Sequence, residues 1–241
     1  MGPAVVNRTF DSAEAVIRCV STFPLSDHPL VHRIRETQDA GLLWLLINNT
    51  YQGTSVHFAA WLASVTAVVE DERVRSLLAR QLNEEMGDGN VERAHSRLMT
   101  DFLVGIERLR PANLSPSLTE PGQALQESLR QHYLSRDQFE ALAALMAGEI
   151  CAQQLIATVA ELMTPHLERV DTLKLTWLTH HNEVEGEHAD ESLDLARFVP
   201  RDAAAIRSVV KGAFGLHRAL WESMASLQGR AVASEGLRSA R

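Results

Sequence analysis

Cysteine is scarce in this chain, and so is positive charge. Only Cys19 and Cys151 occur among 241 residues, too few for a disulfide framework, which fits the reducing cytoplasm. Basic residues number 23 against 31 acidic ones, giving a net charge of −8, whereas a nucleic-acid partner requires a clustered basic face. We therefore expect a cytoplasmic protein that binds no nucleic acid.

Targeting signals and long apolar runs are missing as well. Residues 1–10 have no basic region followed by an apolar core, so we expect no signal peptide. The most apolar run, residues 41–47, is too short to span a bilayer and is followed by two asparagines. We expect no membrane segment.

Helical periodicity fills most of the chain. Apolar residues recur at spacings of three and four, and we find no alternating strand pattern, no repeat and no glycine-rich phosphate loop. The expected helices include 42–69, 74–86, 91–109, 124–133, 136–163, 167–198 and 202–227, with a proline-rich connection at 111–122. The sequence predicts one all-α domain over residues 1–241, ending in a flexible tail from about residue 229.

One segment, residues 179–193, reads THHNEVEGEHADESL. Within it His181, Glu185 and His188 stand at i, i+4 and i+7, so on a helix their side chains fall within about 60° of arc. Imidazole and carboxylate groups together suit iron, manganese or zinc, and helix bundles present such ligands to their interior. The alternative is a solvated face, because the neighbouring acids clearly meet water.

A second segment carries an isolated acid. Glu149 is the only charged residue within 141–160, and an unpaired buried carboxylate costs several kcal/mol. Glu149 therefore requires a cation. The alternative is a narrow polar stripe, shared with Gln153, that reaches solvent.

A third segment, residues 82–99, adds a further set of candidates. Glu85, Asp88, Glu92 and His95 share one face if the helix is continuous, although two glycines between them favour a bend or a break. His95 continues on an apolar stripe and should face the interior. The three segments together supply up to three imidazoles and three carboxylates, more than one tetrahedral zinc needs, and two carboxylate-bridged irons are favoured.

These motifs resemble those of the heme-oxygenase-like diiron oxidases, seven-helix enzymes that bind two irons rather than heme. The matching pieces are NEEMGDGNVERAH at 83–95, AGEI at 147–150, HNEVEGEH at 181–188 and LINNTYQGTSVHFAAWL at 46–62. The similarity extends over about residues 30–225. It implies an all-α, seven-helix, up-and-down heme-oxygenase-like bundle.

The resemblance also implies a ligand set. The family's metal ligands fall on Glu85, His95, Glu149, His181, Glu185 and His188. Relatives often have Asp where this chain has Glu185, and some draw a Glu from the helix corresponding to 42–69, which has no acid here. Asp88 and Glu92 therefore stay open as alternatives for the ligand of the first motif.

The activity implied by the resemblance is reductive activation of O2 by two Fe(II)/Fe(III) ions. We expect N-oxygenation of a small amine or amino-acid-derived substrate in natural product biosynthesis. The alternative is oxidative C–C fragmentation of an amino or fatty acid. Either reaction needs an external electron donor, such as a ferredoxin with its reductase, and a homodimer is left open.

Aromatic residues on the helix expected at 42–69 are candidates for a substrate pocket. They are Trp44, Tyr51, His57, Phe58 and Trp61. An aromatic stripe at helical spacing more often packs in the core.

Two other activities of the same fold remain open. A heme-degrading enzyme would need an axial histidine near the N-terminus, where His28 or His32 is available, although an acidic cluster fits poorly with anionic heme propionates. A thiaminase-like hydrolase would use a cysteine nucleophile, and Cys151 lies two residues from Glu149.

Overall fold

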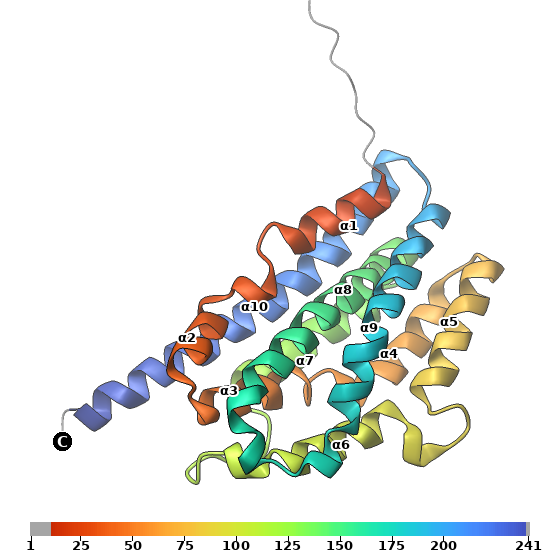
Figure 1. The fold of residues 1–241 in the computed structure, drawn as a ribbon. Helices are drawn as coiled ribbons and strands as arrows, with labels where there is room; N and C mark the ends of the chain where they lie inside the picture. The colour runs from red at the N-terminus through yellow and green to blue at the C-terminus, as the bar shows by residue number, and fades with distance from the viewer. Residues whose placement is uncertain (1–10, 240–241) are drawn as a thin grey trace, which may run out of the picture.

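The computed structural model describes residues 11–239, except for the side chains of residues 183–185, 187 and 230–239. No strand occurs in this range, and the all-α prediction is confirmed (Figure 1). The α-helices are α1 (Ser12–Ser21), α2 (Pro29–Thr37), α3 (Ala40–Thr50), α4 (Ser55–Val68), α5 (Glu72–Glu85), α6 (His95–Gly105), α7 (Glu120–Tyr133), α8 (Gln138–Met163), α9 (Thr176–Asp194) and α10 (Ala203–Ser239).

The central helix of the bundle is α8. It packs against α10 and α9 and is surrounded by α1, α7 and α4 (Figure 1). Four alanines between residues 141 and 147 are buried there, and Gly212 lets α10 approach closely, because a Cβ at that position would lie 2.1 Å from the carbonyl oxygen of Glu140. The stretch Gln138–Arg169 is also long and apolar enough to cross a membrane, but 67% of its apolar window is buried inside the bundle.

Aspartates begin several of these helices. Asp11, Asp39, Asp71 and Asp137 precede α1, α3, α5 and α8, and each side chain accepts a hydrogen bond from a backbone N–H of the first turn. Such N-caps satisfy donors that the helix itself leaves unpaired. The helix starts are therefore set locally by the sequence.

The helix expected over 42–69 is divided in two. α3 ends at Thr50 and α4 begins at Ser55. Gly53 lies in the turn between them, where a Cβ would come within 2.8 Å of the carbonyl oxygen of Asn49. The hydroxyl of Thr54 donates to the carbonyl oxygen of Thr50 at 2.7 Å, so local bonds replace part of the helical ladder. This break brings residues 50–55 to the wall of an internal cavity.

A second break separates α5 from α6. Gly87, Asp88 and Gly89 have φ values of 81°, 54° and 83°, a left-handed run that no α-helix contains. A Cβ on Gly87 would lie 2.3 Å from the carbonyl oxygen of Asn90, so this turn requires glycine. The continuous face considered for residues 85–95 does not form.

The described chain contains α1 to α10 where a seven-helix bundle was expected, and the break at Gly53 accounts for one of the additional helices. After the two breaks the chain changes partners: α4 packs against α5 and α6, and α3 packs against α7 and α10. α10 extends to Ser239, beyond residue 229, where we expected a flexible tail to begin.

Candidate metal centre

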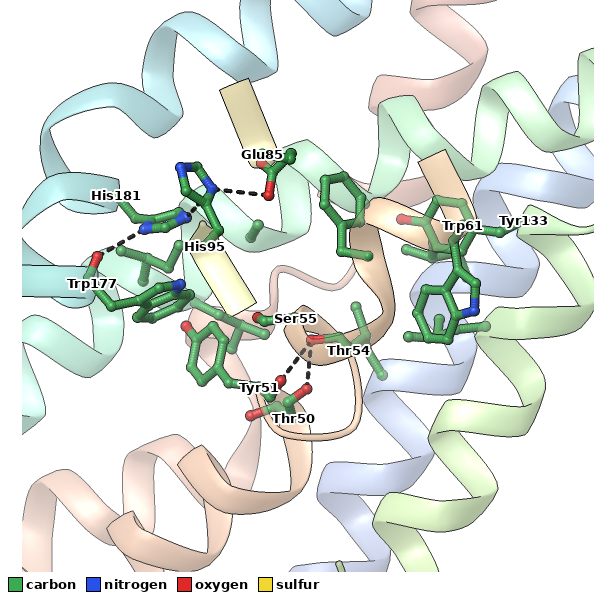
Figure 2. Close-up of a pocket in the computed structure, with 18 residues that line it drawn as sticks. Thr50, Tyr51, Thr54, Ser55, Trp61, Glu85, His95, Tyr133, Trp177 and His181 are labelled. Atoms are coloured by element: carbon green, nitrogen blue, oxygen red, sulfur yellow. Dashed lines mark hydrogen bonds and ion pairs between the residues drawn. The ribbon is translucent and has the colours of Figure 1, made fainter. Parts of the chain in front are cut away.

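Three of the expected ligands meet in the interior of the bundle. Glu85 ends α5, His95 begins α6, and His181 lies in the second turn of α9. The Nδ1 of His95 is 2.9 Å from the Oε2 of Glu85 and 3.1 Å from the Nε2 of His181. All three residues are buried. Figure 2 shows them together at one end of a cavity.

The orientation of His181 is set by its own helix. Its Nδ1 lies 2.7 Å from the carbonyl oxygen of Trp177, one turn earlier, so Nδ1 carries the proton and Nε2 presents its lone pair toward His95. Burial and the nearby ring of His95 lower the pKa of His181, and the bond to Trp177 raises it; together they bring the pKa to about 3. The neutral imidazole, the form that binds metals, therefore predominates at neutral pH.

Glu149 approaches the same place from α8. It is 4% exposed, which excludes the solvent-reaching stripe considered as its alternative. The Nε2 of Gln81 donates to Glu149 Oε1 at 2.5 Å. Burial and the nearby carboxylate of Glu85 raise the pKa of Glu149, and the bond from Gln81 lowers it; together they bring the pKa to about 8. Glu149 and Glu85 thus form a buried pair of carboxyl groups in which Glu149 keeps its proton at neutral pH, and a cation between them would favour the ionised form of both.

The remaining residues of the α9 motif lie near this cluster. His188 is half-buried, and its proximity contributes to the lowered pKa of His181. The side chain of Glu185 lies outside the described residues, although its position on α9 is helical. His188 lines a polar cavity together with His95 and His180, of about 1000 Å³ including the space open to solvent.

The two alternatives for the first-motif ligand, Asp88 and Glu92, are exposed to solvent. Asp88 is exposed and accepts a hydrogen bond from Asn83 at 2.8 Å. Glu92 is exposed and lies 3.5 Å from Arg97. The left-handed turn after Met86 interrupts the helical face that was expected to carry both, although Asp88 still lines the polar cavity with His95 and His188. Of the acids in this segment, Glu85 is therefore the one placed to bind a metal.

An apolar cavity begins at the cluster and extends between the helices. It encloses about 730 Å³, counting the space at its opening. Its walls are Thr50, Tyr51, Thr54, Ser55, Phe58, Trp61, Glu85, His95, Leu129, Tyr133, Gly148, Ala152, Leu155, Ile156, Trp177, His181, Leu216 and Leu220. His95 lines this cavity and the polar one, so it stands between them.

Only some of the residues expected to form a substrate pocket line this apolar cavity. Tyr51, Phe58 and Trp61 line the apolar cavity. Trp44 does not line it and is buried in the core. His57 does not line it either: its ring stacks on Trp61 with 5.7 Å between centroids, and its Nε2 is 2.5 Å from Gln126 Nε2. For Trp44 and His57, packing explains the position.

The residues available to the alternative activities do not face the apolar cavity. His28 is buried, and its Nδ1 accepts a hydrogen bond from the backbone N–H of Leu30 at 3.0 Å. His32 is exposed beside Arg35. Cys151 is fully buried, and burial raises the pKa of its thiol, which disfavours the thiolate that a nucleophile requires.

Sequence reasoning missed three residues of the site, namely Gln81, Trp177 and His180. Gln81 and Trp177 each lie one turn before an expected ligand, at i−4 from Glu85 and His181, so helical spacing offered a signal. The ring of His180 lies 5.7 Å from those of His95 and His181 between centroids. Its only signal was its place beside His181 in the chain.

The donor set fits iron in its chemistry. Buried imidazole nitrogen and carboxylate oxygen are the ligands of non-heme iron sites in helix bundles. Among the described side chains, no three stand already arranged to hold an ion, because Glu85 and His181 both direct their acceptors at the Nδ1 of His95. A cation would take the place of the proton that these groups share.

Comparison with known proteins shows the family of the chain. A family model described as "iron-containing redox enzyme" matches residues 50–221. No curated protein matches the chain in sequence.

Solved structures similar to this chain show its fold. A TenA homolog from Pseudomonas syringae pv. tomato has a TM-score of 0.72 at 14% identity, covering 95% of this chain and 98% of that one. A CADD-like protein of unknown function from Nostoc punctiforme has a TM-score of 0.69 at 14% identity, with 93% and 96% covered. A domain of unknown function with a heme oxygenase-like fold from Shewanella denitrificans has a TM-score of 0.67 at 14% identity, with 92% of each chain covered.

Proposed function

Because the chain belongs to the family of iron-containing redox enzymes, we propose that it is a non-heme diiron oxygenase acting on a small amine. The observation that carries the proposal is the position of Glu85, His95 and His181, which close one end of an apolar cavity. A substrate held in that cavity lies directly beside the groups that would bind iron.

Six residues would hold two irons. They are Glu85, His95, Glu149, His181, Glu185 and His188. When bound, the two ferrous ions supply the site of O2 binding and two of the electrons for oxygen transfer. The family description names iron without stating how many ions are bound, and the second ion is part of the proposal.

Hydrogen bonds with neighbouring residues orient two of these ligands. The carbonyl oxygen of Trp177 fixes the tautomer of His181, and Gln81 holds a carboxylate oxygen of Glu149. Such contacts around a metal site set the direction and basicity of its ligands. The apolar walls of the cavity exclude water and would hold a substrate beside these ligands, so its orientation would decide which of its atoms reacts.

We propose N-oxygenation as the reaction. An amine, O2, two electrons and two protons give a hydroxylamine and water, and the electrons come from an external donor such as a ferredoxin with its reductase. The volume of about 730 Å³ falls within the range of small-molecule pockets. The competing reaction at the same site is oxidative C–C fragmentation of an amino or fatty acid.

An anaerobic Fe(II) titration tests the metal content directly. We expect saturation near two equivalents per chain, and saturation at one equivalent or none would reject the diiron proposal. Two adjacent histidines provide a matched comparison: His181→Ala should lose at least one equivalent, whereas His180→Ala should keep two. Equal losses in both variants would mean that the ligand set on α9 is wrongly assigned.

Isotope labelling separates the two reactions. With 18O2, reductant and an accepted amine, N-oxygenation places label on nitrogen in the product. A shortened carbon skeleton would favour fragmentation instead. His188→Ala should abolish either product, and retention of product would place the chemistry away from this face of α9.

A further inference from the structure

The apolar cavity carries no positive charge on its walls. Among the described residues that line it, none is Lys or Arg, and the acidic and imidazole groups are confined to Glu85, His95 and His181 at the metal end. A charged group on a ligand, placed away from that end, would be buried without a counter-charge, which is strongly unfavourable. The part of a substrate that lies away from the metal end is therefore uncharged.

One hydrogen-bond donor on the wall has no acceptor. Trp177 is 2% exposed, and its Nε1 has no hydrogen-bond partner within the described part of the chain. Its ring lies 4.4 Å from that of His181 and 4.9 Å from that of Tyr51, between centroids, and Figure 2 shows it between the two. Buried indole N–H groups normally find a partner, so this one points to an acceptor on a ligand.

The other end of the cavity is an aromatic surface. The rings of Trp61 and Tyr133 stack at 5.3 Å with 17° between their planes, and Phe58 packs edge-on against Tyr133 at 6.1 Å. Figure 2 shows Trp61 and Tyr133 across the cavity from the metal cluster. Flat aromatic side chains of this kind bind an apolar ring or chain by burial and offset stacking.

We propose that the substrate is a hydrophobic amine with one uncharged oxygen acceptor close to its nitrogen. Trp177 Nε1–H donates to that oxygen, and the apolar body lies against Trp61 and Tyr133, which directs the nitrogen at the metal end. Amides or esters of aromatic and branched amino acids have this chemistry. Amines with a charged tail do not. The inference rests on the proposed amine oxygenation, and it assigns Trp177 as the residue that positions the substrate.

Three probe amines separate the effects of the aromatic ring, the oxygen acceptor and a charged tail on binding. L-Phenylalaninamide carries the ring and the oxygen, 2-phenylethylamine lacks the oxygen, and L-lysinamide replaces the ring by a charged tail. Binding is measured by calorimetry on the metal-free protein and on the anaerobic Fe(II) protein, where no turnover occurs. We expect phenylalaninamide to bind about five- to tenfold more tightly than 2-phenylethylamine, as one hydrogen bond provides, and lysinamide to bind more weakly than both.

The indole N–H of Trp177 supplies a second readout. The protein contains 4 Trp residues, and the 1H–15N indole signal that Trp177→Phe removes belongs to Trp177. This signal should move downfield with phenylalaninamide and not with 2-phenylethylamine. In Trp177→Phe the preference for the amide should fall to about onefold, while 2-phenylethylamine binds as before. The matched control is Trp221→Phe, which removes an indole outside the cavity and should leave the preference unchanged.

Several results would overturn the inference. These are an amide preference that survives in Trp177→Phe, tighter binding of L-phenylalanine than of its amide, binding of lysinamide as tight as that of phenylalaninamide, or no binding of any probe. Each can occur with normal iron loading, which would leave the diiron proposal intact. Conversely, failure to bind two irons would reject the proposed function, while the measurements on the metal-free protein would still test the cavity.

Discussion

Glu140 and Glu149 lie on the same helix and are equally buried, at 4% exposed each, but their pKa values shift in opposite directions. Burial raises the pKa of Glu140, yet hydrogen bonds from Lys211 at 2.7 Å and Ser135 at 3.0 Å outweigh it, so the pKa is lowered. Glu149 has the neutral amide of Gln81 instead, and its pKa rises to about 8. Glu140 therefore has a cationic partner within the fold, whereas Glu149 has none among its described hydrogen-bond partners and would be stabilised by a bound cation.

We expect Glu149→Gln to stabilise the metal-free protein at alkaline pH. The pKa of Glu149 is about 8 in the fold against an ordinary value of 4.5, so between these values the native state holds a proton that the unfolded chain has released. The unfolding free energy of the wild type therefore falls as the pH rises from about 4.5 to 8. The advantage of the variant should grow by about 1–3 kcal/mol from pH 5 to pH 8, measured by urea unfolding with a chelator present.

Glu140→Gln is the matched control. It removes the carboxylate from a pair with Lys211, whose side chain is 68% exposed, so at pH 7 we expect a loss of about 1–2 kcal/mol. Glu149→Gln should in addition bind fewer than two irons, while Glu140→Gln binds both. Effects of the same sign on the stability of the metal-free protein at pH 8 would contradict this account.

The helical spacing of apolar residues made some parts of the site predictable from the sequence. Glu149 was identified because a single acid stands in an apolar helix, and the structure confirms that it is buried. His95 was placed in the interior by its apolar stripe, and it lies there. Both deductions use only the neighbours of a residue on its own helix, where the sequence is informative.

Contacts between helices were not predictable in the same way. The approach of Gln81 to Glu149 depends on how α5 packs on α8, and no spacing within one helix reports it. Asp88 and Glu92 were placed on the ligand face because helical spacing was continued through two glycines, whereas left-handed φ values end the helix there. The break at Gly53 was missed for a related reason, because apolar periodicity continues on both sides of it.

The buried histidine of the N-terminal region should make the protein acid-sensitive. Burial is the main cause that lowers the pKa of His28, to about 4 from 6.5. A lowered pKa means that stability is present above pH 6.5 and is lost as the pH falls through about 4. In His28→Asn, whose amide oxygen can still cap α2, this loss should shrink by about 1–3 kcal/mol, measured by urea unfolding from pH 7 to pH 4.

His32→Asn serves as the comparison, because His32 is exposed on the same helix. It should leave the acid dependence of the wild type unchanged. At pH 7 we expect His28→Asn to lose about 1–2 kcal/mol, since its ring packs on Trp221 at 4.5 Å between centroids. An unchanged slope in His28→Asn would assign acid unfolding to other groups.

Cys151 should be inert in the native protein. It is fully buried, and burial raises the pKa of its thiol, so little thiolate is present and reagents do not reach it. Iodoacetamide at pH 8 should modify half-buried Cys19 first and Cys151 only after denaturation, as followed by mass spectrometry. Cys151→Ala should keep iron binding and activity, at a cost of about 1 kcal/mol in stability. Rapid alkylation of Cys151 with loss of activity would instead indicate a thiaminase-like nucleophile.

The turn between α5 and α6 should control the metal centre through backbone geometry. At Gly87 a Cβ would lie 2.3 Å from the carbonyl oxygen of Asn90 and 2.6 Å from the backbone nitrogen of Ala94, so Gly87→Ala must move the chain that leads into His95. Glu85 and His95 stand on the two sides of this turn, and their 2.9 Å contact requires both helix ends in place. We expect a loss of about 3 kcal/mol in stability and weaker binding of Fe(II), measured by titration under conditions where the variant remains folded.

Gly89→Ala separates the effect of a steric clash at the new Cβ from the effect of the left-handed backbone conformation. Gly89 has nearly the same positive φ, 83° against 81° for Gly87, but a Cβ there meets nothing within 4 Å. The left-handed conformation alone costs about 1–2 kcal/mol, so Gly89→Ala should lose about that amount of stability and bind iron as the wild type does. Equal losses of iron affinity in the two variants would show that loop strain, and not the displacement of His95 from Glu85, governs the site.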